Sequence, residues 1–125
     1  MQSLTARTAA RTALQGVPEL AGKIFYPDQA RPVDATLYAR LTVISNPPVN
    51  DFQGEAYAVV RAQVDVYSLS TTDSQALSTA EKARVALTAA GFRRVGGGQP
   101  ITHEGQRDPQ GRLWYRVTTD YSKNA

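Results

Sequence analysis

One stretch of the chain, residues 57–68, alternates between two kinds of side chain over its whole length, with Val59 the one apolar exception. One set of alternate positions is apolar: Ala58, Val60, Ala62, Val64 and Val66. The other set is polar or aromatic: Tyr57, Arg61, Gln63, Asp65 and Tyr67. A period of two is typical of a strand with one buried face, whereas a strand buried on both faces reads as a continuous apolar run. The stretch therefore predicts an antiparallel sheet with one covered face.

A helix that could cover this face follows directly in the chain. Between residues 72 and 90 the apolar positions change to helical spacing: Ala76, Ala80, Ala83, Leu87 and Ala90. Thr72 and Gln75 have the spacing of a capping box, and Gly91 is placed to end the helix. The strand and this helix are expected to form one packing unit.

A second helix is predicted at the N-terminal end, over residues 4–15. Ser3 is a candidate cap, and Gly16 and Pro18 are typical stop signals. Its apolar side is mostly alanine, so the helix needs a partner surface to be stable. We expect it to pack on the same sheet.

The remaining strands are shorter or less regular. Residues 22–27 form a β-prone piece that Pro27 ends, which suits a sheet edge, and residues 35–44 alternate as a further strand. The turn residues 108–111, Asp-Pro-Gln-Gly, predict a hairpin between residues 100–106 and 112–121. Residues 46–54, with paired prolines, form a long connecting loop.

These elements predict one α+β domain spanning residues 1–125, with an antiparallel sheet of about four main strands and two helices on one face. The chain has 125 residues, a net charge of +3, and 42% hydrophobic residues, all ordinary for a globular domain. It has no cysteine, so it can work in a reducing compartment such as a cytoplasm. No apolar run reaches the length of a membrane span, and no signal-peptide core is present, so no membrane role is expected.

The sequence offers little for catalysis. His103 is the one histidine and lies in a polar segment flanked by glycine, where a solvent-exposed side chain is the simpler interpretation. Gly96, Gly97 and Gly98 lack the lysine and hydroxyl residue of a phosphate-binding loop. The carboxylates show neither the pairing of a hydrolase nor the spacing of metal ligands. We expect no enzyme activity, no metal and no cofactor.

The sheet face opposite the helices carries the side chains that most suggest binding. Tyrosine, tryptophan and arginine are enriched at the centres of protein interfaces. The candidate interface residues are Tyr38, Arg40, Tyr57, Arg61, Tyr67, Trp114 and Arg116. An alternative is a solvated face on which Arg40, Asp65, Arg116 and Asp120 form cross-strand charge pairs. Stacking of single-stranded nucleic acid is a third alternative, but the glycine-flanked aromatic signature of RNA-binding sheets is missing.

The order of the pieces resembles a known family. Gly22-Lys-Ile-Phe-Tyr-Pro27, a strand that ends in Ile44-Ser45-Asn46-Pro47, the central Arg61-Ala-Gln-Val-Asp-Val-Tyr67, an alanine-rich helix and a closing Tyr115-Arg-Val-Thr-Thr-Asp-Tyr121-Ser122 carry the likeness. Together they resemble the tail completion proteins of long-tailed phages, which are related to tail terminator and head-to-tail joining proteins. The likeness covers nearly the whole chain.

The resemblance implies a structural protein of the virion tail or neck, which assembles in the host cytoplasm. Such proteins form a ring, usually of six copies, that ends the tail tube and joins it to the head connector or a head-completion protein. The implied partners are therefore further copies, the tail tube protein and the connector, with no sequence-specific nucleic acid. Candidate loop contacts to them are Pro47, Pro48, Phe52, Arg94, His103 and Arg107. The competing interpretation is a small basic adaptor domain that binds nucleic acid or a host protein.

Overall fold

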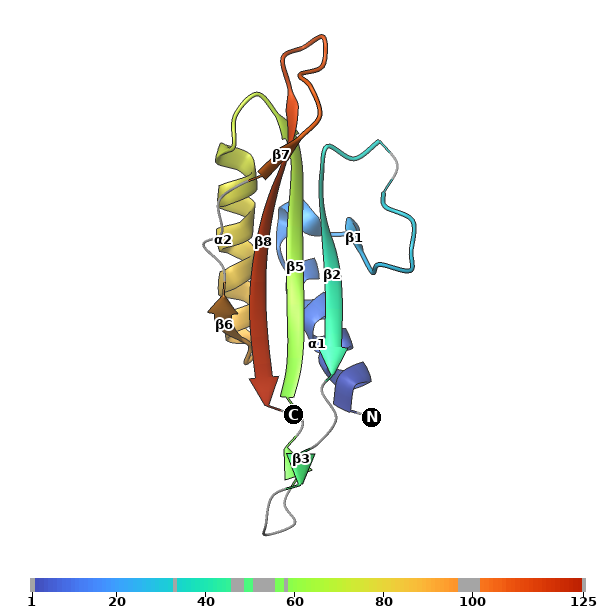
Figure 1. The fold of residues 1–125 in the computed structure, drawn as a ribbon, viewed down its shortest axis with the longest axis vertical. Helices are drawn as coiled ribbons and strands as arrows, with labels where there is room; N and C mark the ends of the chain where they lie inside the picture. The colour runs from blue at the N-terminus through green and yellow to red at the C-terminus, as the bar shows by residue number, and fades with distance from the viewer. Residues whose placement is uncertain are drawn as a thin grey trace.

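The computed structural model describes residues 2–32, 34–45, 49–50, 56–57, 59–96 and 102–124. The helices are α1 (Gln2–Gln15) and α2 (Ser74–Ala89), with a 3-10 turn at Pro18–Leu20. The strands are β1 (Ile24–Phe25), β2 (Leu37–Ser45), β3 (Val49–Asn50), β4 (Ala56–Tyr57), β5 (Val59–Ser70), β6 (Arg93–Gly96), β7 (Thr102–Glu104) and β8 (Leu113–Asn124). Figure 1 shows an elongated molecule whose long axis follows β2, β5 and β8.

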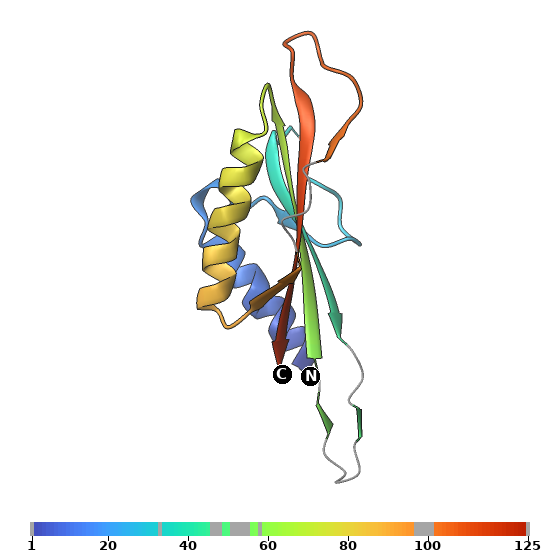
Figure 2. The same cartoon turned by 60° about the vertical axis from the view of Figure 1, so that its left-hand side comes forward.

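The main sheet has the strand order β1-β2-β5-β8-β6, and β7 also pairs with β8. The long strands β2, β5 and β8 are antiparallel neighbours. Both helices lie on one side of the sheet (Figure 2). The predicted α+β class and the two helices on one face are therefore confirmed. The sheet has more strands than expected, and it is mixed rather than purely antiparallel because β1 runs parallel to β2.

The core lies between the sheet and the helices, on the face that the alternation predicts. Val60, Ala62, Val64 and Val66 of β5 are all buried, whereas Ala58 lies outside the described residues. From the helices the core receives these fully buried side chains: Ala10, Leu14, Ala76, Ala83 and Leu87. Complete burial of a leucine side chain stabilises the fold by about 2 kcal/mol, so the two leucines anchor helices that are otherwise alanine-lined.

The helix ends differ from the predictions at two points. α1 begins at Gln2, so Ser3 lies inside the helix and is not its cap. The capping box at α2 is also wrong, because the helix begins at Ser74 without a side-chain cap. Gln75 instead accepts a hydrogen bond of 2.7 Å from the buried hydroxyl of Ser68, which has no water to bond with.

The C-terminal end of α2 follows the prediction. Gly91 has a positive φ of 93°, a conformation that glycine adopts at little cost. The N–H of the next residue, Phe92, donates to the carbonyl oxygen of Leu87, which closes the helix.

The predicted central strand is interrupted near its start. β5 begins at Val59, and Tyr57 belongs to β4, which pairs with β3 in a separate two-stranded ladder. Tyr57 is therefore not on the main sheet, and its place on the sheet face was predicted wrongly. The loop predicted at residues 46–54 contains β3, and its other residues lie outside the described part of the chain.

The strand at residues 93–96 was not predicted from the sequence. This segment, β6, pairs with β8 and contains a bulge between Arg94 and Gly96. The predicted hairpin near the C-terminus is confirmed, with β7 paired to β8. In its turn the Asp108 carboxylate accepts hydrogen bonds from the backbone N–H of Arg112 and Gln110 and from the Arg112 side chain. The bond from the Arg112 N–H is the main cause that lowers the pKa of Asp108.

Candidate interaction surface

The sheet face opposite the helices, called the open face below, carries an aromatic cluster. Tyr38 of β2 is its centre and is only 4% exposed. Its ring stacks on Tyr67 of β5, with 4.9 Å between centroids, and meets the edge of Trp114 of β8 at 5.4 Å. Phe25 of β1 lies 5.6 Å from it on the other side. The cluster thus spans four neighbouring strands.

A charged network borders this cluster. Arg40 lies directly opposite Asp65 in the ladder between β2 and β5, and donates two hydrogen bonds to it, of 2.9 and 3.2 Å. The hydroxyl of Thr118 on β8 donates to the other oxygen of Asp65. The Asp65 side chain is 3% exposed, so these bonds compensate for the loss of water around a buried charge. The cross-strand pair of Arg40 with Asp65, expected for a solvated face, is confirmed.

The surroundings of Arg40 favour the charged form of its guanidinium group. Partial burial disfavours the charged guanidinium, but the hydrogen bonds and negative charge of Asp65 outweigh that effect and raise its pKa. The guanidinium also lies 5.9 Å from the centre of the Tyr67 ring. Arginine, carboxylate and aromatic ring therefore hold one another in a fixed arrangement.

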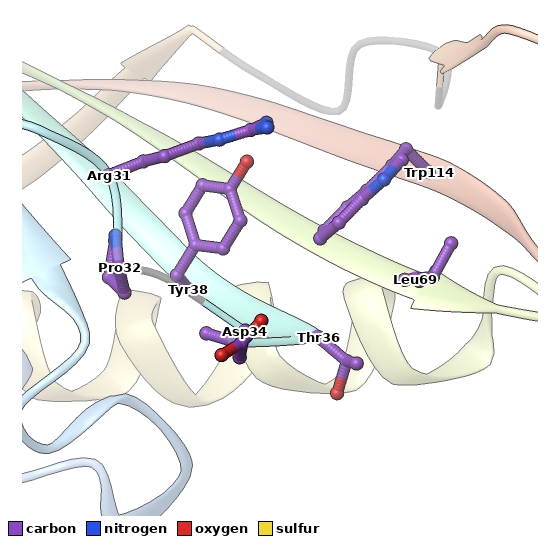
Figure 3. Close-up of a pocket in the computed structure, with 8 residues that line it drawn as sticks. Arg31, Pro32, Asp34, Thr36, Tyr38, Leu69 and Trp114 are labelled. Carbon is purple, nitrogen blue, oxygen red and sulfur yellow. The ribbon is translucent and has the colours of Figure 1, made fainter.

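A pocket of about 370 Å³ lies between this cluster and the segment that leads into β2 (Figure 3). Tyr38 and Trp114 form part of its wall, and Leu69 of β5 lies beside them. The leading segment contributes Arg31, Pro32, Asp34, Ala35 and Thr36. Two aromatic rings and an aliphatic side chain, with one cation and one carboxylate beside them, suit contact with a protein surface that offers apolar groups.

The predicted interface residues fall into three places. Tyr38, Arg40, Tyr67, Trp114 and Arg116 gather around the cluster, with Arg116 opposite Tyr67 in the ladder. Arg61 is exposed on the same strand as Tyr67, but six residues away, which is about 20 Å along a strand. Tyr57 lies on β4, away from the main sheet.

Three of the predicted loop contacts lie on described segments, and these segments are different elements. Arg107 lies in the turn before β8 and donates a hydrogen bond of 2.8 Å to the carbonyl oxygen of Gly111. Arg94 is on the short strand β6, and His103 is on β7, with its side chain outside the described part of the chain. Pro47, Pro48 and Phe52 lie outside the described residues.

Sequence reasoning missed two parts of the surface. Phe25 and Arg31 join the open face only because their segments lie beside β2 in space, and a two-residue strand gives no periodic signal. On the opposite side, a groove of about 350 Å³ separates the end of α1 from α2. Val85, 56% exposed, lines it together with Pro18 and Lys82. The sequence could have predicted the exposure of Val85, because it does not belong to the set of apolar positions with helical spacing.

Two further features are absent from the described ranges. No helix there is long and apolar enough to span a membrane. No group of three or more histidine or acidic side chains capable of holding a metal ion occurs in the same part of the chain.

Comparison with known proteins gives the chain a family. No curated protein matches its sequence. A chain from a solved structure described as the virion of a native gene transfer agent (GTA) particle is similar in fold, with a TM-score of 0.48 and 15% identity over 94% of this chain and 92% of that chain. The family model of the tail completion protein gp17 matches residues 2–122. The chain therefore belongs to the tail completion protein gp17 family, a family of structural proteins of phage tails.

Proposed function

We propose that the chain forms a ring at the head-proximal end of the tail tube, where it ends the tube and joins it to the head connector. The single observation that carries this proposal is the family match over residues 2–122. Six copies is the ring number that the family resemblance suggests. The shape of the protomer supports the same role, as follows.

The protomer is elongated along its three long strands, and its two hairpins project from opposite ends. The β3–β4 ladder lies beyond one end of the main sheet, and the turn between β7 and β8 lies beyond the other (Figure 1). A ring built from upright protomers would present one hairpin on each of its two flat faces. One face would then meet the tube and the other the connector.

The sides of the protomer also suit a ring. In a head-to-tail ring each copy uses two different patches, one for each neighbour. The two edges of the main sheet differ in this way, since β1 and β2 form one edge and β6 forms the other, whereas the open face with its aromatic cluster and pocket is left for a tail partner. The open-face residues Tyr38, Arg40, Tyr67, Trp114 and Arg116 are proposed contacts to that partner.

Measuring the mass of the assembly tests this proposal. The purified chain is analysed by native mass spectrometry and electron microscopy, alone and after incubation with purified tail tubes. A ring-sized species in solution, or one that forms only at the end of tubes, supports the proposal. A monomer that does not bind to tail tubes, and that binds DNA with salt-dependent affinity, would contradict the proposal and favour the basic adaptor.

A further inference from the structure

The outer edge of β2 is covered over only part of its length. β1 pairs with β2 at Ala39 and Arg40 and then ends, since Pro27 has no backbone N–H with which to continue a ladder. No strand in the described part of the chain lies outside residues 41–45. A groove of about 240 Å³ runs along this edge, lined by Arg7, Tyr26, Pro27, Asp28, Leu41, Thr42 and Val43.

The backbone of this edge has groups ready for pairing. The N–H of Leu69 donates to the carbonyl oxygen of Thr36, which fixes the phase of the ladder between β2 and β5. Because bonded and non-bonded pairs alternate in an antiparallel ladder, the backbone groups of Leu41 and Val43 point away from β5. The N–H of Leu41 faces Phe25 of β1, which pairs with Arg40, so the C=O of Leu41 and both backbone groups of Val43 are left toward the groove. The same phase explains why the N–H of Ala39 donates outward, to Lys23.

The opposite edge of the sheet is β6. Its residues lie level, along the strand direction, with the uncovered part of β2. Arg93 is opposite Ser122, Ser122 is opposite Arg61, and Arg61 is opposite Ile44. The next row of opposite residues, one position along the strands, runs in the same way from Arg94 on β6 to Val43 on β2. Each row crosses three strand spacings, about 15 Å. Two copies placed side by side would therefore bring the two edges together without a shift along the strands.

Strand direction and side chains agree with this match. Each of the neighbouring strands β2, β5, β8 and β6 is antiparallel to the next, so β6 of one copy would be antiparallel to β2 of an adjacent copy in the same orientation. In the described part of the chain four large hydrophobic side chains are exposed, and two of them lie at these edges: Ile44, 55% exposed, and Val95, 49% exposed. An uncovered strand edge beside apolar side chains is a template for another strand.

We propose that the β6 edge of one copy pairs with residues 41–45 of the next, so that the sheet continues from protomer to protomer around the ring. This inference rests on the proposed ring and names the contact that builds it. Arg93 then lies beside Ile44 on the open face. Arg94, on the helix side with Tyr121, approaches Asp28, whose side chain is 79% exposed and meets Arg7 at 3.7 Å.

The absence of cysteine from the natural sequence permits a sharp test. In the variant Ile44→Cys/Arg93→Cys both substituted side chains are exposed, so the fold should tolerate them. The two positions of one copy are about 15 Å apart, too far for a disulfide, which needs Cα atoms within about 7 Å. Every disulfide formed must therefore join two copies. The matched control is Ile44→Cys/Ser78→Cys, in which an exposed residue of α2 is replaced instead of Arg93.

Both variants are oxidised on tail tubes and separated by non-reducing gel electrophoresis. The expected result is a ladder of covalent oligomers up to the ring number for Ile44→Cys/Arg93→Cys and none for the control. If the protein binds to tubes but both variants give the same bands, the edge pairing is wrong and the proposed ring is not affected. If the unmodified chain forms no assembly, alone or on tubes, the proposed function falls and the pairing falls with it.

Discussion

The two faces of the sheet become buried by different means. The helix-covered face uses small and branched apolar side chains, such as Val64 and Leu41, beneath two alanine-rich helices. No helix of the described ranges covers the open face, yet Tyr38 and Asp65 are almost as buried as the core. There the covering comes from neighbouring side chains, namely rings and one ion pair that crosses two strands. The first face depends on area removed from water, whereas the second depends on matched partners, and substitutions should separate the two.

The largest effect is expected on the helix-covered face, from Leu87→Ala. Leu87 is fully buried, and truncation would remove its apolar contacts and leave a cavity. We expect the free energy of unfolding to fall by about 3 kcal/mol. Urea denaturation followed by circular dichroism measures this, with the exposed Leu77→Ala of the same helix as control. Equal losses for the two variants would contradict the packing described for α2.

The next effect concerns the ion pair of the open face. Asp65→Ala should cost about 2 kcal/mol, less than a fully buried pair, because Arg40 keeps partial access to water. The double variant Arg40→Met/Asp65→Leu should lose less than Asp65→Ala, since no charge is left without its partner. Urea titrations of both variants decide the point. A double variant less stable than the single one would show that area, not pairing, governs this face as well.

An alkaline titration tests the helix-covered face again. Burial raises the pKa of Tyr121 to about 12, although Arg94 and Arg84 partly oppose the shift. Below pH 10 this tyrosine is neutral in both states. Between pH 10 and 12 the unfolded chain ionises first, so its contribution to stability is lost as the pH rises, by up to about 2 kcal/mol. Tyr121→Phe should flatten that decline in urea titrations at pH 9 to 11.5, and parallel curves for variant and parent would contradict the assignment.

The smallest effects on stability are expected from Trp114→Ala and Arg61→Glu on the open face. Trp114 is half-buried at the pocket, so about 1 kcal/mol is expected, and exposed Arg61 should change stability by less than about 0.5 kcal/mol. Their effect on assembly should be larger, because both are proposed contacts. Native mass spectrometry on and off tubes compares them with Thr12→Ala, an exposed control on α1. Normal assembly by both would mean that the open face is not an interface.

The local sequence pattern predicted most helices and strands, but it did not predict which strands pair with which. The alternation around Val64 and the glycine after α2 predicted a buried strand face and a helix end correctly, because each depends on a few neighbouring residues. The predicted β-prone piece at residues 22–27 contains β1 at the sheet edge, but its parallel pairing with β2 was not predicted. β6 was missed, since a strand of four residues carries no clear period and forms only by pairing with β8. Tyr57 is displaced from the main sheet because it pairs with Val49 of β3, a partner that its own segment does not indicate.

The sequence by itself determined the α+β class, the side of the sheet that the helices cover, and the hairpin turn at Asp108. Those features follow from side-chain period and turn chemistry within a short window. Only the tertiary structure decided that Arg40 meets Asp65 and that four aromatic rings gather from four strands. It also decided that β6, at one edge of the sheet, lies level with Val43 and Ile44 of β2 at the other. These depend on register between strands far apart in the chain, and register is set by the packing of the whole sheet.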